Sequence, residues 1–232
     1  SGNYDCVTGY PPQLNMNRYI TLKVKQGEQI NIALSADTNN TPIKIVSGTW
    51  DTTIIAGTNR TGSISYPSND TIMTIYGDVK EFDCSNNDSN ITGLDVSHNT
   101  ALTYLNCYGN KSTSLDVNKN TALTYLRCGD NKLKSLDVSK NIALCTLDCY
   151  NNNLTLLDVN KNTALTYLRC EYNNLTSLDV NKNTALTYLR CGDNKLTSLD
   201  VSKNTALTHL ECGDNKLTSL DVSACTALTH LE

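Results

Sequence analysis

Apolar residues recur at a fixed spacing through about two thirds of the chain. In residues 186–206, LTYLRCGDNKLTSLDVSKNTA, leucine, cysteine and valine occupy positions 1, 4, 6, 11, 14 and 16. The same spacing returns every 21 residues, beginning near Val79, so the segment is built of internal repeats. The leucine at position 14 falls at Leu94, Leu115, Leu136, Leu157, Leu178, Leu199 and Leu220, and the cysteine at Cys107, Cys128, Cys149, Cys170, Cys191 and Cys212. Cys84 occupies the same position one copy earlier, followed by two additional residues, Asp88 and Ser89.

Alternation around the cysteine predicts one short strand in each copy. Leu189 and Cys191 point inward, whereas Tyr188, Arg190 and Gly192 point outward. One copy cannot bury its leucines alone, but stacked copies share a continuous core. We therefore expect a parallel sheet along a concave face, with short extended or 3₁₀-like segments on the convex side. Two recurring asparagines per copy, for example Asn194 and Asn204, are expected to satisfy backbone groups in the turns.

Residues 1–78 lack this spacing and have a β pattern. Short β-branched segments alternate with Gly, Asn and Pro, which is typical of a small sandwich or barrel. The segments are YITLKVK, EQINIALS, PIKIVSGTW, GSISY and TIMTIYG. Because solenoids need their open ends covered, we expect residues 1–78 to form a β-sandwich-like domain that caps residues 79–232, which hold about seven coils and no evident C-terminal cap.

The repeat matches the leucine-rich-repeat signature L-x-x-L-x-L-x-x-N-x-L, with cysteine at the last apolar position of the strand. With LDVSKNTALTYLRC, CGDNKLTSLDV and the junction IYGDVKEFDCSNN, the chain resembles cell-surface leucine-rich-repeat proteins of Bacteroidetes that carry an N-terminal PKD-like or Ig-like β-domain. The resemblance implies a mainly β protein with a right-handed solenoid, export to the cell surface or the extracellular space, and a binding or adhesive role without enzymatic activity.

Charge and hydropathy exclude two classes of partner. The net charge is −4 and charged residues make up 18% of the 232 residues, so no basic field holds a nucleic-acid backbone. No apolar run approaches the ~20 residues that span a bilayer. No basic-then-apolar signal segment begins the chain, which indicates a mature or internal fragment.

The repeated cysteines are interpreted as core residues. Equivalent residues on neighbouring strands lie about 4.8 Å apart with parallel Cβ vectors, whereas a disulfide brings its Cβ atoms to about 3.8 Å. Zinc sites need converging thiolates, usually from closely spaced pairs, and these cysteines are 21 residues apart. Cysteine behaves instead as a small buried hydrophobe. Three cysteines lie outside the series, and their pairing stays open: Cys6, Cys145 and Cys225.

Aspartates and histidines raise the question of a metal site. The aspartates of LDV stack from copy to copy, but nearby lysines and turn N–H groups offset their charge, and the Gly-rich nonapeptide of calcium-binding rolls is absent. His209 and His230 replace tyrosine in successive copies, near Glu211 and Glu232. A weak adventitious metal contact is conceivable there, but a solvated surface is the favoured interpretation. We expect no metal and no cofactor.

The outward strand positions are the candidate functional residues. Exposed tyrosine beside arginine is typical of interface hot spots. We predict that the concave face binds a protein partner; the alternatives are a glycan that stacks on the same tyrosines, or a structural spacer without a ligand. The expected contact residues are Tyr104, Tyr125, Arg127, Asp148, Tyr167, Arg169, Tyr188, Arg190, His209 and Glu211.

The sequence also predicts self-association through the C-terminal coil. The segment LTHLE ends within a predicted strand, and an unpaired strand edge favours pairing with another chain. Sedimentation velocity at increasing concentration should therefore reveal dimers. A monomeric profile at all concentrations would contradict this expectation.

Overall fold

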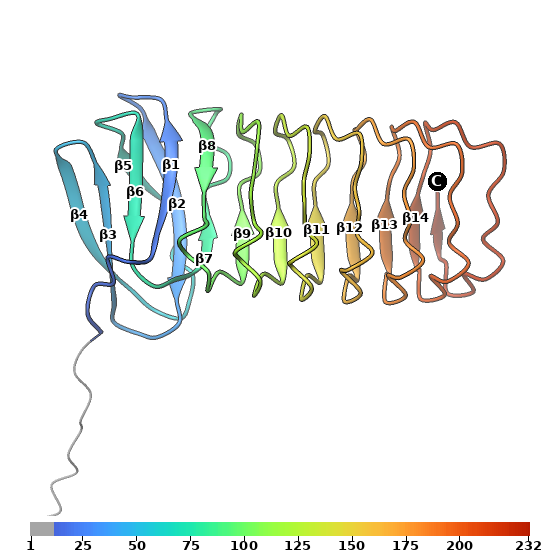
Figure 1. Cartoon of the computed structure of the whole chain (residues 1–232), viewed down its shortest axis with the longest axis horizontal. Helices are drawn as coiled ribbons and strands as arrows, with labels where there is room; N and C mark the ends of the chain where they lie inside the picture. The colour runs from blue at the N-terminus through green and yellow to red at the C-terminus, as the bar shows by residue number, and fades with distance from the viewer. Residues whose placement is uncertain (1–11) are drawn as a thin grey trace, which may run out of the picture.

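The chain forms an elongated all-β structure in a computed structural model that describes residues 12–232 (Figure 1). Fifteen strands follow one another in the described residues, with no helix among them. A membrane-spanning helix is accordingly not found in residues 12–232.

The N-terminal part contains two layers of strands. One sheet has five strands in the order β4-β3-β6-β1-β8, and its neighbour ends in β7-β2-β5. Ile20, Ile45 and Ile75 from the first sheet and Ile32 and Phe82 from the second are fully or almost fully buried in one core. The strands are β1 (Tyr19–Val24), β2 (Gln29–Ala36), β3 (Thr41–Ser47), β4 (Trp50–Ala56), β5 (Ile64–Pro67) and β6 (Ile72–Tyr76).

The segment PIKIVSGTW differs from the expectation of a single strand. Strand β3 ends at Ser47, and β4 begins at Trp50 and pairs with it antiparallel over seven residue pairs. Gly48 has a φ of 61°, which lets a two-residue turn reverse the chain. Strand β4 continues to Ala56, beyond the predicted segment, and alternation exposes Asp51, Thr53 and Ile55 on one of its faces.

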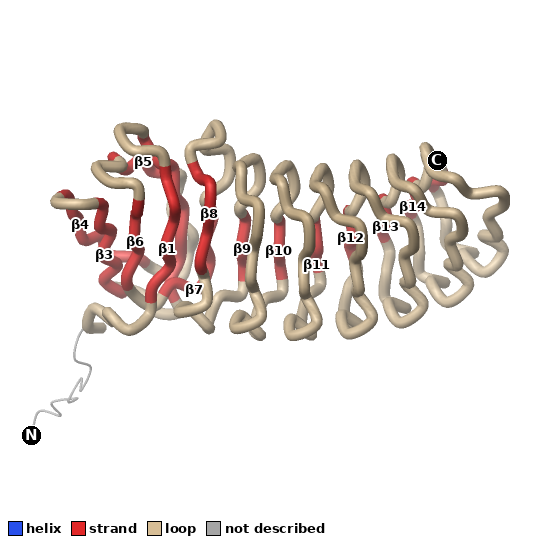
Figure 2. The backbone as a smooth tube through the Cα atoms, turned by 45° about the horizontal axis from the view of Figure 1, so that its top comes forward, coloured by secondary structure: helices blue, strands red, loops and turns tan. Residues whose placement is uncertain are grey.

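The repeats form a ladder of short parallel strands in register (Figure 2). Each strand in the middle of the ladder has three residues, and extended segments and turns complete the coil. The strands are β9 (Tyr104–Asn106), β10 (Tyr125–Arg127), β11 (Thr146–Asp148), β12 (Tyr167–Arg169), β13 (Tyr188–Arg190), β14 (His209–Glu211) and β15 (His230–Leu231).

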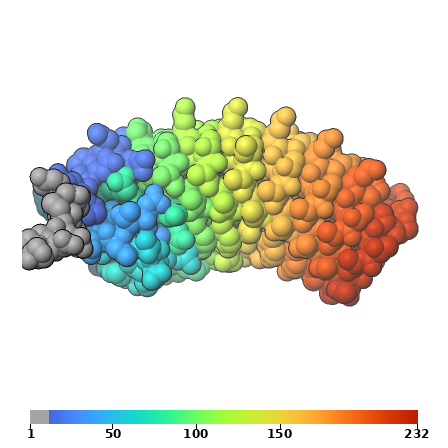
Figure 3. Space-filling model, turned by 90° about the horizontal axis from the view of Figure 1, so that it is seen from below, coloured from blue at the N-terminus to red at the C-terminus, as the bar shows by residue number. Residues whose placement is uncertain are grey.

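Two strands connect the repeats to the N-terminal part. Strand β7 (Val79–Asp83) pairs parallel with β9 and antiparallel with β2, so one ten-stranded sheet runs through both parts. Strand β8 (Ile91–Asp95) lies at the position expected for a convex-side segment but pairs antiparallel with β1. The first coil is thus held at both its strand and its convex side, and Figure 3 shows a continuous surface across the join.

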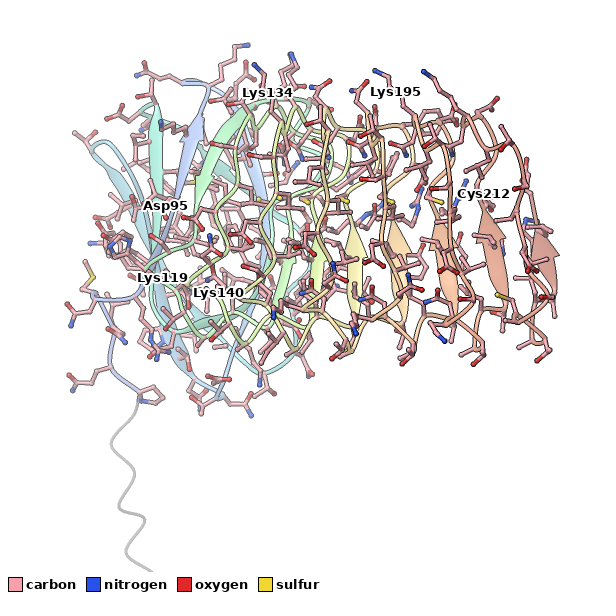
Figure 4. All side chains as sticks on the ribbon, turned by 45° about the vertical axis from the view of Figure 1, so that its right-hand side comes forward. Asp95, Lys119, Lys134, Lys140, Lys195 and Cys212 are labelled. Carbon is pink, nitrogen blue, oxygen red and sulfur yellow. The ribbon has the colours of Figure 1, made fainter. Side chains whose placement is uncertain are left out.

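The core of the repeats consists of stacked leucine, valine and cysteine. Leu168, Cys170 and Val180 have no exposed surface, and their equivalents in neighbouring coils are similarly buried. Figure 4 shows the sulfur atoms inside the coils, with Cys212 near the C-terminal end. All nine cysteines of residues 12–232 are free, and the seven of the repeated series are buried, which agrees with their interpretation as core residues. Of the three cysteines outside the series, Cys145 is exposed, Cys225 is buried, and Cys6 lies outside the described residues.

Two columns of buried asparagines join successive coils at their turns. The Asn152 amide nitrogen donates to the carbonyl oxygens of Cys128 and Cys149, both at 3.1 Å, while its amide oxygen accepts from the Leu133 N–H at 2.9 Å. On the other side, Asn162 donates to the carbonyl oxygens of Val138 and Asn141 at 3.0 and 2.9 Å. The expected role of both series is therefore confirmed.

The turn after each strand requires a left-handed backbone conformation. Positive φ recurs every 21 residues at Gly109, Asp130, Asn151, Tyr172, Asp193 and Asp214. Glycine, asparagine and aspartate tolerate this conformation, so the position is polar or glycine in five of the six coils. Tyr172 is the exception, and its side chain is 54% exposed.

The aspartates of LDV serve the convex-side turns. Asp137, for example, accepts a hydrogen bond from the Ser139 N–H at 2.9 Å. This bond is the main reason why the pKa of Asp137 is lowered. The equivalent aspartates accept the same backbone hydrogen bond two residues on, so each of these side chains has a structural role in its convex-side turn.

The buried thiols make stability sensitive to alkaline pH. Burial raises the pKa of Cys107 to about 12 and raises that of Cys149 further, whereas an unfolded thiol ionises near pH 8.5. The unfolded chain therefore loses protons first, and the free energy of unfolding should fall as the pH rises from about 8.5 towards 12. Urea unfolding at each pH, under reducing conditions, measures this slope.

Two variants isolate the thiol contribution to this pH dependence. Cys149→Ala should reduce the slope, and Cys145→Thr, which alters an exposed thiol, should leave it unchanged. The same slope in all three proteins would contradict the assignment.

Candidate partner-binding face

The concave face is the outward surface of strands β7 and β9–β15, and all ten predicted contact residues lie on it. The parallel register places residues 21 apart side by side, so the face carries straight columns of equivalent side chains. Three columns run along it, at the first strand position, at the third strand position and just beyond the cysteine.

The first column is aromatic. It contains, in order, Glu81, Tyr104, Tyr125, Thr146, Tyr167, Tyr188, His209 and His230. The rings of Tyr104 and Tyr125 stack at a centroid distance of 4.4 Å, and so do those of Tyr167 and Tyr188. His209 continues the second stack at 4.3 Å from Tyr188. Each strand contributes one ring to this column, so the spacing between neighbouring strands sets the distance between the stacked rings.

Thr146 interrupts the aromatic column. The absence of a ring leaves a depression of about 410 Å³ between Tyr125 and Tyr167. Its other lining residues are Arg127, Asp148 and Arg169. Two strand spacings, roughly 9–10 Å, separate the flanking tyrosines, which is room for one inserted flat group. We call this depression the Thr146 slot.

The second column consists of charged residues that pair with one another. Arg127 and Arg169 contact the same Asp148 oxygen at 3.2 and 3.4 Å. Arg169 also pairs with Glu171 at 2.5 Å, and Arg190 pairs with Glu211 at 2.6 Å. These contacts hold the guanidinium groups in fixed positions along the tyrosines.

Asp148 lies between two arginines of this column. This residue is only 4% exposed beneath Arg127 and Arg169, although it lines the floor of the Thr146 slot, and its role as a contact residue stays a prediction. Burial raises the pKa of Asp148, although both arginines act to lower it. Asp148 therefore positions the two arginines at the floor of the Thr146 slot.

Glu171 is a buried carboxylate that the sequence analysis did not single out. It lies beyond the cysteine rather than on the strand, yet it is 3% exposed and accepts from Arg169 Nε at 3.0 Å. Burial by itself lowers the pKa of Arg169, but the bond to Glu171 and the charge of Asp148 raise it above its ordinary value. Arg169 is accordingly fixed in its charged form. In the sequence, the only sign of this role is that position 171 carries Glu where the equivalent position of the neighbouring coils carries Tyr or Gly.

The third column places two tyrosines under the arginines. The Tyr150 and Tyr108 hydroxyls are 2.9 Å apart and form a hydrogen bond across Gly129. Arg127 lies over the Tyr108 ring at 4.3 Å and Arg169 over the Tyr150 ring at 4.4 Å. Such cation–π contacts add to the rigidity of the face.

Arg60 extends this face onto the N-terminal part. Its guanidinium lies over the Tyr104 ring at 4.3 Å. Burial acts to lower the pKa of Arg60, but the Tyr104 hydroxyl, the next largest influence, contributes to a net rise. Nothing in the spacing of the sequence marks Arg60, because this contact arises from the packing of two distant segments.

The geometry defines the class of the fold: the chain is a leucine-rich-repeat solenoid of coils about 21 residues long. No protein-family model and no curated protein sequence matches the chain. Its structural neighbours are bacterial internalin-type leucine-rich-repeat proteins.

The functional domain of InlJ from Listeria monocytogenes, which includes a cysteine ladder, is 37% identical with a TM-score of 0.56, and the match covers 72% of this chain and 42% of that one. The internalin InlF from the same species is 25% identical with a TM-score of 0.52, covering 59% and 44%. The Leptospira interrogans leucine-rich-repeat protein LIC12759 shares the fold at 23% identity and a TM-score of 0.55, covering 59% and 38%. The chain spans less than half the length of each.

Gly129 provides a test of how closely the third column is packed. A Cβ at this position would lie 2.7 Å from Tyr150 Cδ1 and 3.0 Å from the Tyr150 carbonyl oxygen. Gly129→Ala should therefore displace Tyr150 and lower the free energy of unfolding by about 1–3 kcal/mol. The equivalent Gly213 has nothing within 4 Å of the added carbon, so Gly213→Ala serves as the control. Equal urea midpoints for the two variants would contradict this packing.

Proposed function

We propose that this chain is a non-enzymatic binding module whose concave face recognises a protein partner. The observation that carries the proposal is the Thr146 slot, an opening of one ring in a column of stacked tyrosines with an arginine on each side. An aromatic side chain of a partner would complete the stack, and stacked aromatic pairs contribute about 0.5–1.5 kcal/mol beyond their buried area.

The arginines around the slot indicate which charge the partner should carry beside the inserted ring. Arg127 and Arg190 remain about one third exposed in their side chains, although each contacts a carboxylate. Their fixed guanidinium planes suit a carboxylate next to the inserted ring. We therefore propose an aromatic residue flanked by acidic residues as the recognised feature.

A glycan is the second candidate ligand. The tyrosine rings beside the slot present flat apolar faces, on which a sugar ring also stacks. The slot is polar at its floor and open to solvent, as a sugar hydroxyl requires. The spacer without a ligand is the third interpretation, in which the aromatic column only follows from repeat duplication.

The cellular setting is proposed from the sequence resemblance and the neighbours. We place the chain outside the cell or on its surface, in a Bacteroidetes-type protein, with residues 1–78 as a PKD-like or Ig-like cap and residues 79–232 as the repeat domain. The pairing of β2 with β7 supports the cap, because it covers the first strand of the solenoid. Self-association through the C-terminal coil stays a prediction.

The experiment compares two changes to the slot: one variant fills it, and another removes the side chains that line it. Thr146→Tyr supplies the missing ring and leaves every contact residue in place. Protein and glycan arrays are probed with the wild-type chain, with Thr146→Tyr and with a variant carrying alanine at Tyr125, Arg127, Tyr167, Arg169, Tyr188 and Arg190. Thr205→Tyr, in an exposed turn away from the face, is the matched control.

We expect a protein signal that both face variants weaken by about tenfold or more, since hot-spot truncations cost 2 kcal/mol or more. The control should bind as the wild type does. Signals confined to glycans would favour the glycan ligand. Unchanged binding in Thr146→Tyr and in the alanine variant would overturn the proposal and leave the spacer.

A further inference from the structure

The aromatic column changes its chemistry at its C-terminal end. His209 and His230 stand opposite each other on the parallel strands β14 and β15, and their rings stack at 4.1 Å with an interplanar angle of 7°. Tyr167 and Tyr188 stack equally well in the same column, at 4.4 Å and 8°. Tyrosine would therefore stack at these two positions as well as histidine does. The difference is that the two imidazoles bring nitrogen lone pairs, which can bind a metal ion.

A carboxylate lies beside both imidazoles. Glu211 is two residues after His209 on β14, so both side chains leave the same face of the sheet. Glu211 Oε1 is 2.6 Å from His209 Nε2 and 3.7 Å from His230 Nε2. One donor atom from each of the three residues lies within 4.8 Å of the other two.

These separations suit a small transition-metal ion. Tetrahedral zinc has bonds of about 2.0–2.2 Å to nitrogen and oxygen, which places its donors roughly 3.3 Å apart. The two contacts of Glu211 Oε1 lie on either side of that value. The stacked rings present parallel lone pairs, so binding would tilt the imidazoles towards each other by side-chain rotation, without a change in the strands.

The other oxygen of Glu211 is already held in place. Arg190 Nε contacts Glu211 Oε2 at 2.6 Å, which orients the carboxylate with Oε1 towards the histidines. Fixing a ligand through its second polar atom is a common feature of metal sites. Glu232 Oε2, 3.9 Å from His230 Nε2, is near enough to supply a fourth ligand, and otherwise water occupies that position.

We propose that His209, Glu211 and His230 form a binding site for a divalent transition-metal ion of the zinc class on the concave face. The site differs from the solvated surface that the sequence favoured, because the fold brings the donors of three residues from two coils to one point. It lies beyond the Thr146 slot along the aromatic column, and its binding of metal is independent of the proposed protein partner.

Isothermal titration of the intact chain with zinc chloride tests the proposal. The wild type should bind one zinc ion per chain at this site. His209→Tyr and His230→Tyr restore the residue that other coils carry in the column, and each should weaken zinc binding at least tenfold without loss of folding. Glu211→Gln should also weaken it, because the amide keeps the shape and loses the charge.

Two variants outside the site serve as controls. His98→Lys places there the residue that most other coils carry, and Cys145→Thr removes the exposed thiol of the described residues. Both should bind zinc as the wild type does. An absence of saturable binding, or binding that His209→Tyr and His230→Tyr leave unchanged, would overturn the proposal.

Cobalt(II) identifies the ligand atoms directly. Nitrogen and oxygen ligands give weak visible d–d bands, whereas thiolate ligands add an intense near-ultraviolet charge-transfer band. We expect the first spectrum in the wild type and its loss in His209→Tyr. A charge-transfer band in the wild type would assign the metal to cysteine and contradict the site.

Discussion

Side-chain amide hydrogen bonds at the turns are the interaction on which the structure depends. Each coil contains a strand of about three residues and no helix, so most of its backbone lies in turns and extended segments. Stacking buries these turns, and buried backbone groups without partners are costly. Asn152 and Asn162 show how these groups are satisfied. The Asn152 amide donates to a carbonyl oxygen of its own coil and to one of the preceding coil, and the Asn162 amide donates to two carbonyl oxygens of the preceding coil. Two such bridges per coil fix the stacking distance and the register of all that lies between them.

Fixed register explains both the core and the concave face. Equivalent residues meet their counterparts at one strand spacing, so inside the coils a small cysteine suffices to fill the column beside the leucines. On the outside the same spacing makes the tyrosine rings stack. A different residue at this position in one coil therefore interrupts the aromatic column at that coil. Thr146 produces a slot, and His209 and His230 produce a cluster of nitrogen donors. The local chemistry of the face therefore differs most where a coil departs from the repeat.

The fixed positions of the arginines on the concave face also depend on two buried carboxylates. Asp148 and Glu171 lie beneath arginines that stack on Tyr108 and Tyr150, so the guanidinium groups are held from below and from the side. Side chains that are already held in place would lose little conformational entropy in binding the proposed partner. The arginines are thereby presented to solvent in defined orientations instead of being free side chains.

The sequence by itself determined the solenoid, because a spacing of 21 with inward leucine and cysteine permits one way to bury the apolar residues. It also placed Tyr125, Arg127, Tyr167 and Arg169 on one face, since strand alternation decides which side chains point outward. Only the tertiary structure decided that Asp148 is covered, that Glu171 joins the charged column and that Arg60 reaches Tyr104. It also turned residues 91–95 into a strand that pairs with β1, and it brought His209, Glu211 and His230 together. These features depend on side-chain directions and on contacts between distant segments, and neither follows from local spacing.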